Sequence, residues 1–224
     1  MRYLARGWEN GDRLPAQEVA LVLAQVAAET PSSLLQACRR LIEHHPSAGV
    51  AWWLSARAIG ALDPVDGIDE AARELASDPT TRLLAQALPG LVSCADPGEV
   101  ARVALRRRHR DVKVARTPEG SGCLLVEPQA AGPEIMLVGR ASAAAARRAK
   151  AAGAETWAVV ARGALLPAPL WEALVRRTAQ DHGAGLEVLP ASLVTRVACD
   201  AGLVPPGEAL ARSTCLPVAE LLGW

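Results

Sequence analysis

The sequence of 224 residues contains no phenylalanine, a single tyrosine and only two lysines, Lys113 and Lys150. This bias carries no functional information of its own. Basic and acidic residues number 24 each, so the formal net charge is zero. A chain without net charge has no global electrostatic attraction to nucleic acid or to an anionic membrane surface, and only a local patch could serve such a partner.

Long apolar runs are also absent. A membrane-spanning helix needs about 20 consecutive apolar residues, and no run in this sequence approaches that length. Charged residues at Arg2, Arg6, Glu9 and Asp12 interrupt the region where a secretory signal peptide would have its apolar core. We therefore expect a cytoplasmic protein that does not insert into a membrane.

The cysteines form neither a disulfide framework nor a CxxC zinc motif, because they are odd in number and widely scattered. Most of them lie inside apolar runs, as is typical of free cysteines in a protein core. Glu43, His44 and His45 have no further histidine or cysteine at metal-ligand spacing, so we expect neither a metal site nor a cofactor. The five cysteines are Cys38, Cys94, Cys123, Cys199 and Cys215.

The first ninety residues have apolar positions at helical spacing. Proline follows Thr30 and His45, which marks two helix boundaries, and further helical stretches fall within residues 46–62 and 67–88. We expect a helical domain over residues 1–88. The apolar positions that follow this spacing are Val19, Val22, Leu23 and Val26 in one segment, and Leu34, Cys38, Leu41 and Ile42 in the next.

From residue 89 on, short β-rich runs alternate with helical segments, which predicts an α/β domain with a compact Rossmann-like, mostly parallel sheet over residues 89–224. The expected strands are 90–95, 112–115, 123–128, 156–161 and 186–190, and the expected helices are 97–107, 142–152, 168–180 and 191–200. Ligands of such sheets bind at the carboxyl ends of the strands. The loops to consider are therefore 95–98, 127–132, 162–166 and 190–192.

One connection is shorter than this pattern requires. Only the seven residues 116–122 separate the expected strands 112–115 and 123–126, whereas a parallel crossover with its helix needs about a dozen. The connection reads RTPEGSG, which is turn chemistry, so either the two strands form a hairpin or a βαβ unit is missing. We predict the antiparallel hairpin.

The closing segment LEVLPASLVTRVACDAGLVPP, residues 186–206, resembles that of the translation initiation factor 2B α/β/δ family. There a strand enters a proline, a short helix with a Leu/Ile-Val/Ile-Thr core, and then an acidic residue, glycine and proline. The superfamily includes methylthioribose-1-phosphate isomerase and ribose-1,5-bisphosphate isomerase. HPSAGVAWWLSARAI is similar to the isomerases' helix that begins Arg-Pro-Thr, and GLVSCADPGEVARVAL to their first strand and the helix after it. The resemblance implies the same fold over most of the chain.

The departures from this family point away from catalysis. Gln129 stands where the isomerases have a catalytic aspartate, and glutamine cannot exchange a proton near neutral pH. The Asn-Lys-Ile-Gly-Thr loop becomes VGRAS at residues 138–142, His45 replaces the arginine of Arg-Pro-Thr, and the catalytic cysteine falls at Ala95, one residue beyond Cys94. A helix and a strand that line the family's pocket are missing at the short connection. The resemblance therefore implies a shortened and divergent relative.

Two pairs of residues carry candidate chemistry at the carboxyl edge of the expected sheet. Cys94 and Asp96 could supply a nucleophile and an acid if the register slips by one residue, although no histidine is placed beside them. Arg140 and Ser142 lie at an expected helix start, where free N–H groups and the helix dipole favour an anion. Ser142 is equally typical of an ordinary N-cap residue.

Glu127 and Gln129 could contact a hydroxyl group of a ligand at the switch point of the sheet, or Glu127 could simply pair with Arg140 or Arg162. The dense basic run RRRHR, residues 106–110, has no interleaved aromatic residue and ends a helix. A solvated helix end explains that run better than nucleic-acid contact does.

Taken together, the sequence favours a non-catalytic, initiation-factor-2B-like interaction or regulatory module that binds a phosphorylated metabolite. The alternative is a sugar-phosphate aldose–ketose isomerase with an altered site. Family members dimerise through the α/β domain, and the apolar tail STCLPVAELLGW would expose a large patch on a monomer. We expect a homodimer, or a heteromer with a related paralogue, whose interface draws on Trp171 or Trp224. Trp52 and Trp53 are neighbours on a helix, so one of them is expected at a contact between domains or subunits.

Overall fold

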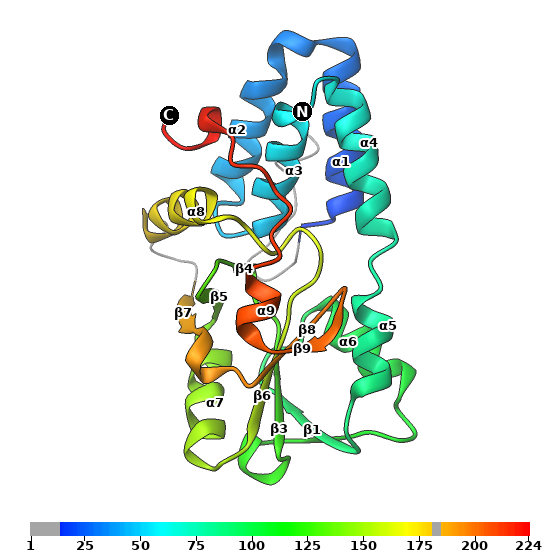
Figure 1. Cartoon of the computed structure of the whole chain (residues 1–224), viewed down its shortest axis with the longest axis vertical. Coiled ribbons are helices and arrows are strands. Elements are labelled where there is room, and N and C mark those ends of the chain that lie inside the picture. Colours follow the sequence, from blue (N-terminus) through cyan, green and yellow to red (C-terminus); the bar gives the residue numbers. More distant parts are fainter. Residues whose placement is uncertain (1–13, 181–184) are drawn as a thin grey trace.

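The computed structural model describes residues 14–180 and 185–224. The chain begins with helices that form the upper part of the molecule in Figure 1, and α5 leads from them to the sheet below. These elements are α1 (Ala16–Glu29), η1 (Pro31–Ser33), α2 (Leu34–His44), α3 (Gly49–Gly60), α4 (Pro64–Ala76) and α5 (Thr80–Ala87). Among the described residues no helix is both long and apolar enough to span a bilayer.

The remainder of the chain is built on a six-stranded sheet with the order β2-β1-β3-β6-β8-β9. All neighbouring strands are parallel except β9, which is antiparallel to β8. The α/β class and the mostly parallel sheet expected from the sequence are therefore confirmed. The strands are β1 (Leu91–Cys94), β2 (Lys113–Ala115), β3 (Cys123–Val126), β6 (Glu155–Val159), β8 (Arg196–Cys199) and β9 (Gly202–Val204).

Helices cover both faces of this sheet. Leu124 and Val126 of β3 pack towards α7 (Arg140–Ala151), whereas Cys123 and Leu125 point to the opposite face, which α5 and α6 (Glu99–Arg107) cover. Side chains alternate in this way because successive residues of a strand point to opposite faces. β3 is apolar throughout for the same reason, as expected of a strand buried on both faces.

A small second sheet stands beside the first. Its antiparallel strands are β4 (Ala130–Ala131), β5 (Ile135–Gly139) and β7 (Leu186–Pro190), in the order β4-β5-β7. The sequence had placed 186–190 in the main sheet, and this assignment is wrong because β7 pairs with β5 along its whole length. The chain is completed by α8 (Ala168–Gln180), α9 (Pro206–Leu210) and the short turns η2 (Pro118–Gly120), η3 (Ala191–Leu193) and η4 (Ala219–Leu221).

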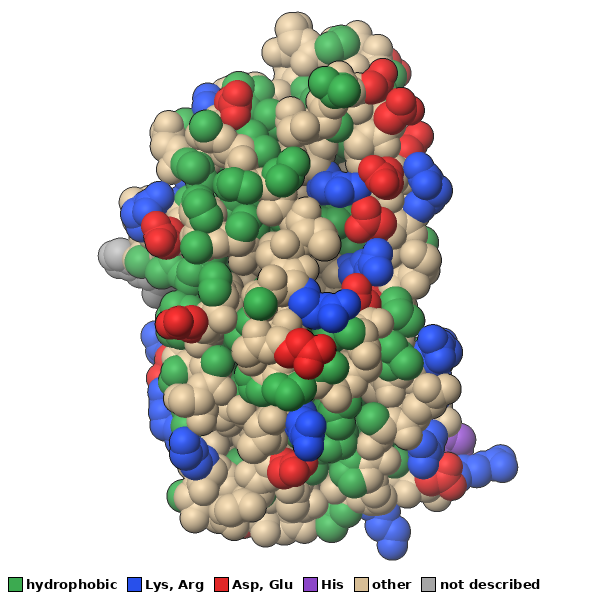
Figure 2. Space-filling view, viewed as in Figure 1, with side chains coloured by type: hydrophobic (Ala, Val, Ile, Leu, Met, Phe, Trp, Pro, Cys, Tyr) green, Lys and Arg blue, Asp and Glu red, His purple; other side chains and the backbone are tan. Residues whose placement is uncertain are grey.

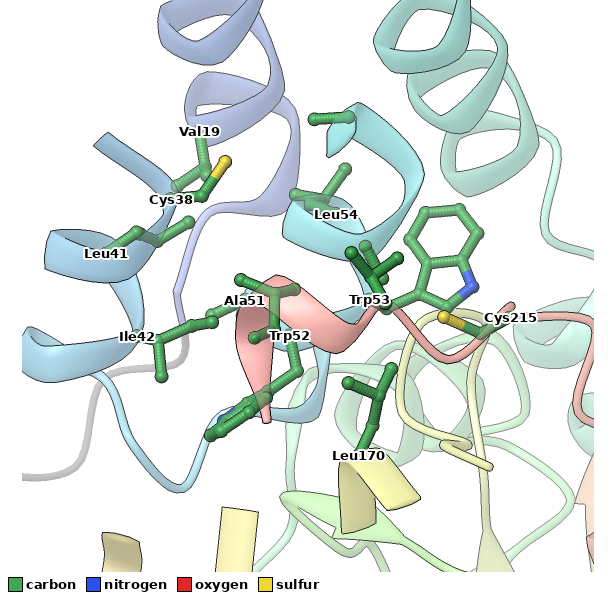
Figure 3. Close-up of a cluster of buried hydrophobic side chains, with 14 of the residues drawn as sticks. Val19, Cys38, Leu41, Ile42, Ala51, Trp52, Trp53, Leu54, Leu170 and Cys215 are labelled. Carbon is green, nitrogen blue, oxygen red and sulfur yellow. The ribbon is translucent and has the colours of Figure 1, made fainter. Parts of the chain in front are cut away.

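The largest hydrophobic core lies among the N-terminal helices and reaches into α8 and the C-terminal tail. In Figure 3, Trp52 and Trp53 point in different directions from α3, and Leu170 of α8 and Cys215 of the tail approach the same cluster. Both indoles are almost completely buried within the chain. The division into domains at residue 88 stays a prediction, as does the role of this tryptophan pair at a domain contact.

The predicted hairpin between residues 112–115 and 123–126 is wrong. β2 and β3 are both parallel to β1 and lie on either side of it, so they do not pair with each other. Strands that flank a third are about 10 Å apart, and seven residues can reach about 23 Å when extended. The connection therefore needs no crossover helix. β2 has only three residues, and its last residue, Ala115, pairs with the same residue of β1, Ser93, as Leu124 of β3 does.

A hydroxyl group fixes this short connection. Ser121 Oγ lies 2.9 Å from Ser93 Oγ and is within hydrogen-bond distance of the carbonyl oxygens of Pro118 and Cys123, to one of which its single hydrogen is donated. Both serines are buried, so these bonds satisfy polar groups that would otherwise be stranded in the core. The single 3-10 turn η2 thus replaces the helix of an ordinary crossover.

The predicted helix over residues 191–200 is also wrong. Only η3 is helical there, and the chain continues into β8, whose Val197, Ala198 and Cys199 are buried between β6 and β9. The β-branched residues of VTRV suit a pleated strand better than a helix. The proline that ends β7 marks a turn between two strands rather than a helix start.

Candidate functional site

Cys94, Asp96 and Glu127 lie near the carboxyl ends of two neighbouring parallel strands, β1 and β3. Glu127 is buried, and its carboxylate caps α6: Oε1 accepts from the backbone N–H of Val100 at 3.3 Å and Oε2 from that of Ala101 at 2.9 Å. A carboxylate at this position satisfies free N–H groups and favours the positive end of the helix dipole. Glu127 therefore has a structural contact at the place where the sequence suggested a ligand.

Cys94 is held as a neutral thiol. Burial, together with the charges of Glu127 and Asp96, raises its pKa to about 12, against a backbone hydrogen bond at Asp96 that lowers it. A thiolate is the nucleophilic form of cysteine. With its proton retained at neutral pH, Cys94 is a poor nucleophile, and the surroundings that the structure gives it oppose a catalytic role.

Asp96 is exposed and lies at the start of α7. A methyl group placed on the Cα atom of Gly139 would be 3.4 Å from Asp96 Oδ2, and Gly139 is the N-cap residue of that helix. Ser142 is buried within the first turn, so the alternative that Ser142 caps the helix is wrong. Arg140 is exposed beside it. The structure thus brings Cys94, Asp96, Glu127 and the start of α7 to one edge.

The first residue of α3, Gly49, packs against Gln129. Gln129 donates its backbone N–H to Leu137 at 2.8 Å, and its carbonyl oxygen accepts from the N–H of Gly49 at 3.0 Å. A methyl group at Gly49 would lie 3.0 Å from both Ala130 Cβ and the carbonyl oxygen of Ala164. The helix therefore packs backbone to backbone against this edge and leaves no room for a side chain at Gly49.

A cavity of about 430 Å³ opens at a different edge, beyond the carboxyl ends of β6 and β8 and against α3 and α4. Ligand pockets commonly have this size and position in α/β folds. Its wall carries one aromatic residue and five charged ones: Trp53, Arg57, Glu74, Arg162, Asp200 and Arg212.

Ion pairs connect the helices to the sheet across this cavity. Arg57 Nη2 is 2.7 Å from Glu74 Oε1 and 2.9 Å from Glu70 Oε2. Arg162 Nη1 is 3.5 Å from Glu74 Oε2, and Arg162 Nη2 is 3.1 Å from Asp200 Oδ2. The guanidinium of Arg162, one of the two arginines that the sequence suggested as partners of Glu127, therefore bonds to Glu74 and Asp200.

Two further contacts fix these arginines. The backbone N–H of Arg162 donates to Asp78 Oδ2 at 2.9 Å, and the guanidinium of Arg57 lies 5.6 Å from the ring centre of Trp53. In contrast, Arg162 Nε is buried and has no hydrogen-bond partner in the described part of the chain. Among the residues that the structure describes, Arg212 makes one distant ion contact, 3.9 Å to Glu208.

The sequence indicated one part of this cavity and missed the rest. The loop 162–166 was identified because it follows an expected strand, and Arg162 lies in it. Arg57 and Glu74 come from two separate helices, so no spacing in the sequence could bring them together. Asp200 was assigned to a helix and is instead the residue that follows β8.

The structure offers no metal-binding group of three or more His, Cys, Asp and Glu residues over 14–180 and 185–224. His45, at the position of the isomerases' arginine, is half-buried, and burial together with the charge of His44 lowers its pKa. It is therefore a weaker anion partner than an arginine, which keeps its charge at any ordinary pH.

No family model matches the chain, and no curated protein matches it in sequence. Its structure is similar to eIF2B beta from Chaetomium thermophilum, with a TM-score of 0.69 and 16% identity over 92% of this chain and 85% of that one. The chain has the initiation-factor-2B fold. The tetrameric eIF2B-beta2-delta2 complex from the same organism also matches, with a TM-score of 0.69 and 15% identity over 88% of this chain and 86% of that one.

The 5-methylthioribose 1-phosphate isomerase of Pyrococcus horikoshii OT3 has the same fold, with a TM-score of 0.53 and 14% identity over 88% of this chain and 81% of that one. The initiation-factor-2B-type fold that the resemblance implied is therefore confirmed. Identities this low establish the fold and leave the activity open.

Proposed function

We propose that the chain is a non-catalytic protein with the initiation-factor-2B fold, which acts as an interaction or regulatory module and binds a phosphorylated metabolite. The observation that carries this proposal is the state of the acid–base positions. Gln129 has no exchangeable proton near neutral pH, Cys94 keeps its proton because its pKa is about 12, and Glu127 is hydrogen-bonded to the start of α6.

The contrast with the isomerase of the same fold supports this reading. General acid–base catalysis needs a group whose pKa lies near the working pH and which can reach the substrate. The backbone contact between Gly49 and Gln129 closes the edge beside these residues. A scaffold with blocked proton transfer can still bind partners and ligands, which is what a regulatory module requires.

The interaction part of the proposal draws on the assembled relative. A chain of the tetrameric complex of eIF2B beta and delta has this fold. We therefore propose that this chain likewise associates with another copy or with a related chain. The interface and the identity of the second chain are part of the proposal and rest on the shared fold.

Incubation with two sugar phosphates tests the absence of catalysis. The purified protein is expected to convert neither methylthioribose 1-phosphate nor ribose 1,5-bisphosphate, while an active isomerase assayed beside it converts its own substrate. Turnover that disappears in Cys94→Ala would show that the chain is an enzyme and would overturn the proposal.

A further inference from the structure

The wall of the cavity beyond β6 and β8 is rich in arginine. Three arginines line it, Arg57, Arg162 and Arg212, together with Glu74 and Asp200, while Glu70 and Glu208 contact Arg57 and Arg212 from beside the cavity. Figure 2 shows Lys and Arg side chains alternating with Asp and Glu side chains across the middle of one face of the molecule. Carboxylates therefore at least match the arginines in number, and an anion here would depend on N–H donors that these carboxylates leave free, in a concave site whose walls exclude part of the screening solvent.

The carboxylates of this cavity are occupied, whereas part of the guanidinium surface is not. Glu74 bonds to Arg57 and Arg162, and Asp200 bonds to Arg162. Arg212 is half-exposed, and its one ion contact within the described ranges, 3.9 Å to a carboxylate oxygen of Glu208, is too long to hold it firmly. Its planar fork of N–H donors matches the oxygens of a carboxylate or phosphate group.

A second donor in the same wall has no acceptor. Arg162 Nε is buried without a hydrogen-bond partner in the part of the chain that the structure describes. Buried donors are nearly always paired, so a rotation of this guanidinium that turns Nε towards an oxyanion in the cavity would satisfy a group that the chain leaves unsatisfied. Such a rotation would exchange the long contact with Glu74, 3.5 Å, for the anion.

The cavity also has space for the body of a ligand. Its volume of about 430 Å³ exceeds that of an oxyanion alone, and apolar atoms of Val160, Leu165 and Ala209 contribute to the wall. Trp53 is almost completely buried, and the guanidinium of Arg57 lies 5.6 Å from its ring centre, so the indole offers little free surface for a planar base to stack on. A small, non-aromatic metabolite fits these properties better than a nucleotide.

We propose that the cavity between α3, α4 and the ends of β6 and β8 binds a small metabolite through its phosphate or carboxylate group, with Arg212 and Arg162 as the anion-binding residues. The inference rests on the proposed function in one respect: it gives the metabolite a site of its own, away from Glu127, Gln129, Arg140 and Ser142. A ligand here contacts helices and sheet together. Its binding therefore couples the two parts of the chain.

Calorimetric titration tests the site with three probes at constant ionic strength: inorganic phosphate, ribose 5-phosphate and citrate. Binding by at least one is expected, and Arg212→Ala should weaken it about 10-fold or more, because a charge-assisted hydrogen bond is lost. Binding by citrate alone identifies the anion as a carboxylate, and binding by the two phosphates identifies it as a phosphate.

Two matched controls locate the binding. Arg106→Ala removes an exposed arginine at the end of α6, and Arg140→Ala removes the arginine at the start of α7. Both should bind the probe as the unaltered protein does. The proposal is overturned if none of the three probes binds at 10 mM, if Arg212→Ala binds normally, or if Arg140→Ala is the variant that loses binding. None of these results bears on turnover, which alone decides whether the chain is an enzyme.

Discussion

The indole ring of Trp224, the last residue of the chain, lies against the guanidinium of Arg177, whose Cζ atom is 3.6 Å from the ring centre. Arg177 also donates to the carbonyl oxygen of Trp224 at 2.9 Å. Trp52 approaches the same ring at 6.1 Å between ring centres, and Arg39 at 5.3 Å. The C-terminal tail thus runs back to the helical part of the molecule and ends beside α2, as Figure 1 shows.

Replacing Trp224 by alanine should therefore destabilise the whole chain. Loss of the cation–π contact and of the ring contact with Trp52 is expected to lower the free energy of unfolding by about 1–3 kcal/mol. Urea denaturation followed by circular dichroism measures this change. Leu216→Ala, in the same tail but 68% exposed, should change the free energy by less than about 0.5 kcal/mol. Equal effects of the two substitutions would show that Trp224 is not held as described.

The position of this tail changes the argument for association that the sequence suggested. Trp171 is buried within the chain and Leu221 is fully buried, so the expectation that the interface draws on Trp171 is wrong. Trp224 is engaged by the chain's own arginines. The apolar tail is explained by folding back onto the helices, which a sequence pattern cannot distinguish from contact with a second subunit.

Association itself stays a prediction, and we expect a dimer of the 23.5 kDa chain. β2 is an edge strand whose Val114 is 55% exposed, and such edges favour pairing with another chain. Sedimentation equilibrium at micromolar concentration should give twice the mass of the chain. A mass equal to one chain would rule out the homodimer and would leave the heteromer as the form to examine.

Sequence periodicity predicted what depends on local pattern. The apolar spacing of Leu34, Cys38, Leu41 and Ile42 located the buried face of α2 correctly, and the alternation of strands and helices gave the fold class. It failed where contacts between distant segments determine the structure. β5 and β7 pair across about fifty residues of sequence, and β8 is a strand because it fills the space between β6 and β9.

The candidate site shows the same limit. Strand ends identified Cys94 and Glu127, but only the fold shows that α6 begins where Glu127 can cap it. The ion pair between Arg162 and Glu74 joins residues 88 positions apart, and nothing in the sequence around either one marks the other. Composition and spacing do not report such charge pairs.

Glu127→Gln should separate the two effects of this carboxylate. A neutral amide cannot cap α6 as strongly, so the free energy of unfolding should fall by about 1–2 kcal/mol. Removal of the charge should also lower the pKa of Cys94, because Glu127 is one of the causes that raise it. The rate of alkylation by iodoacetamide as a function of pH measures that pKa.

Glu99→Gln is the matched control, since Glu99 is an exposed carboxylate in the first turn of the same helix. Its loss should leave the alkylation profile of Cys94 unchanged and alter stability by less than about 0.5 kcal/mol. An unchanged profile in Glu127→Gln would contradict the electrostatic contact between Glu127 and Cys94.

The buried thiols should make the protein sensitive to alkali. Burial raises the pKa of Cys38 to about 11 and those of Cys123 and Cys215 to about 12, from 9.0 in an unfolded chain. Above pH 9 the unfolded chain releases protons that the folded chain retains, so the free energy of unfolding should fall as pH rises, by at most about 1.4 kcal/mol per pH unit for each thiol. With one tyrosine and two lysines in the sequence, few other groups titrate there. Urea denaturation at pH 8, 9 and 10 measures the slope of the free energy of unfolding against pH. The slope should be shallower in Cys123→Ala. A free energy of unfolding that is constant to pH 10 would show that these thiols are not buried.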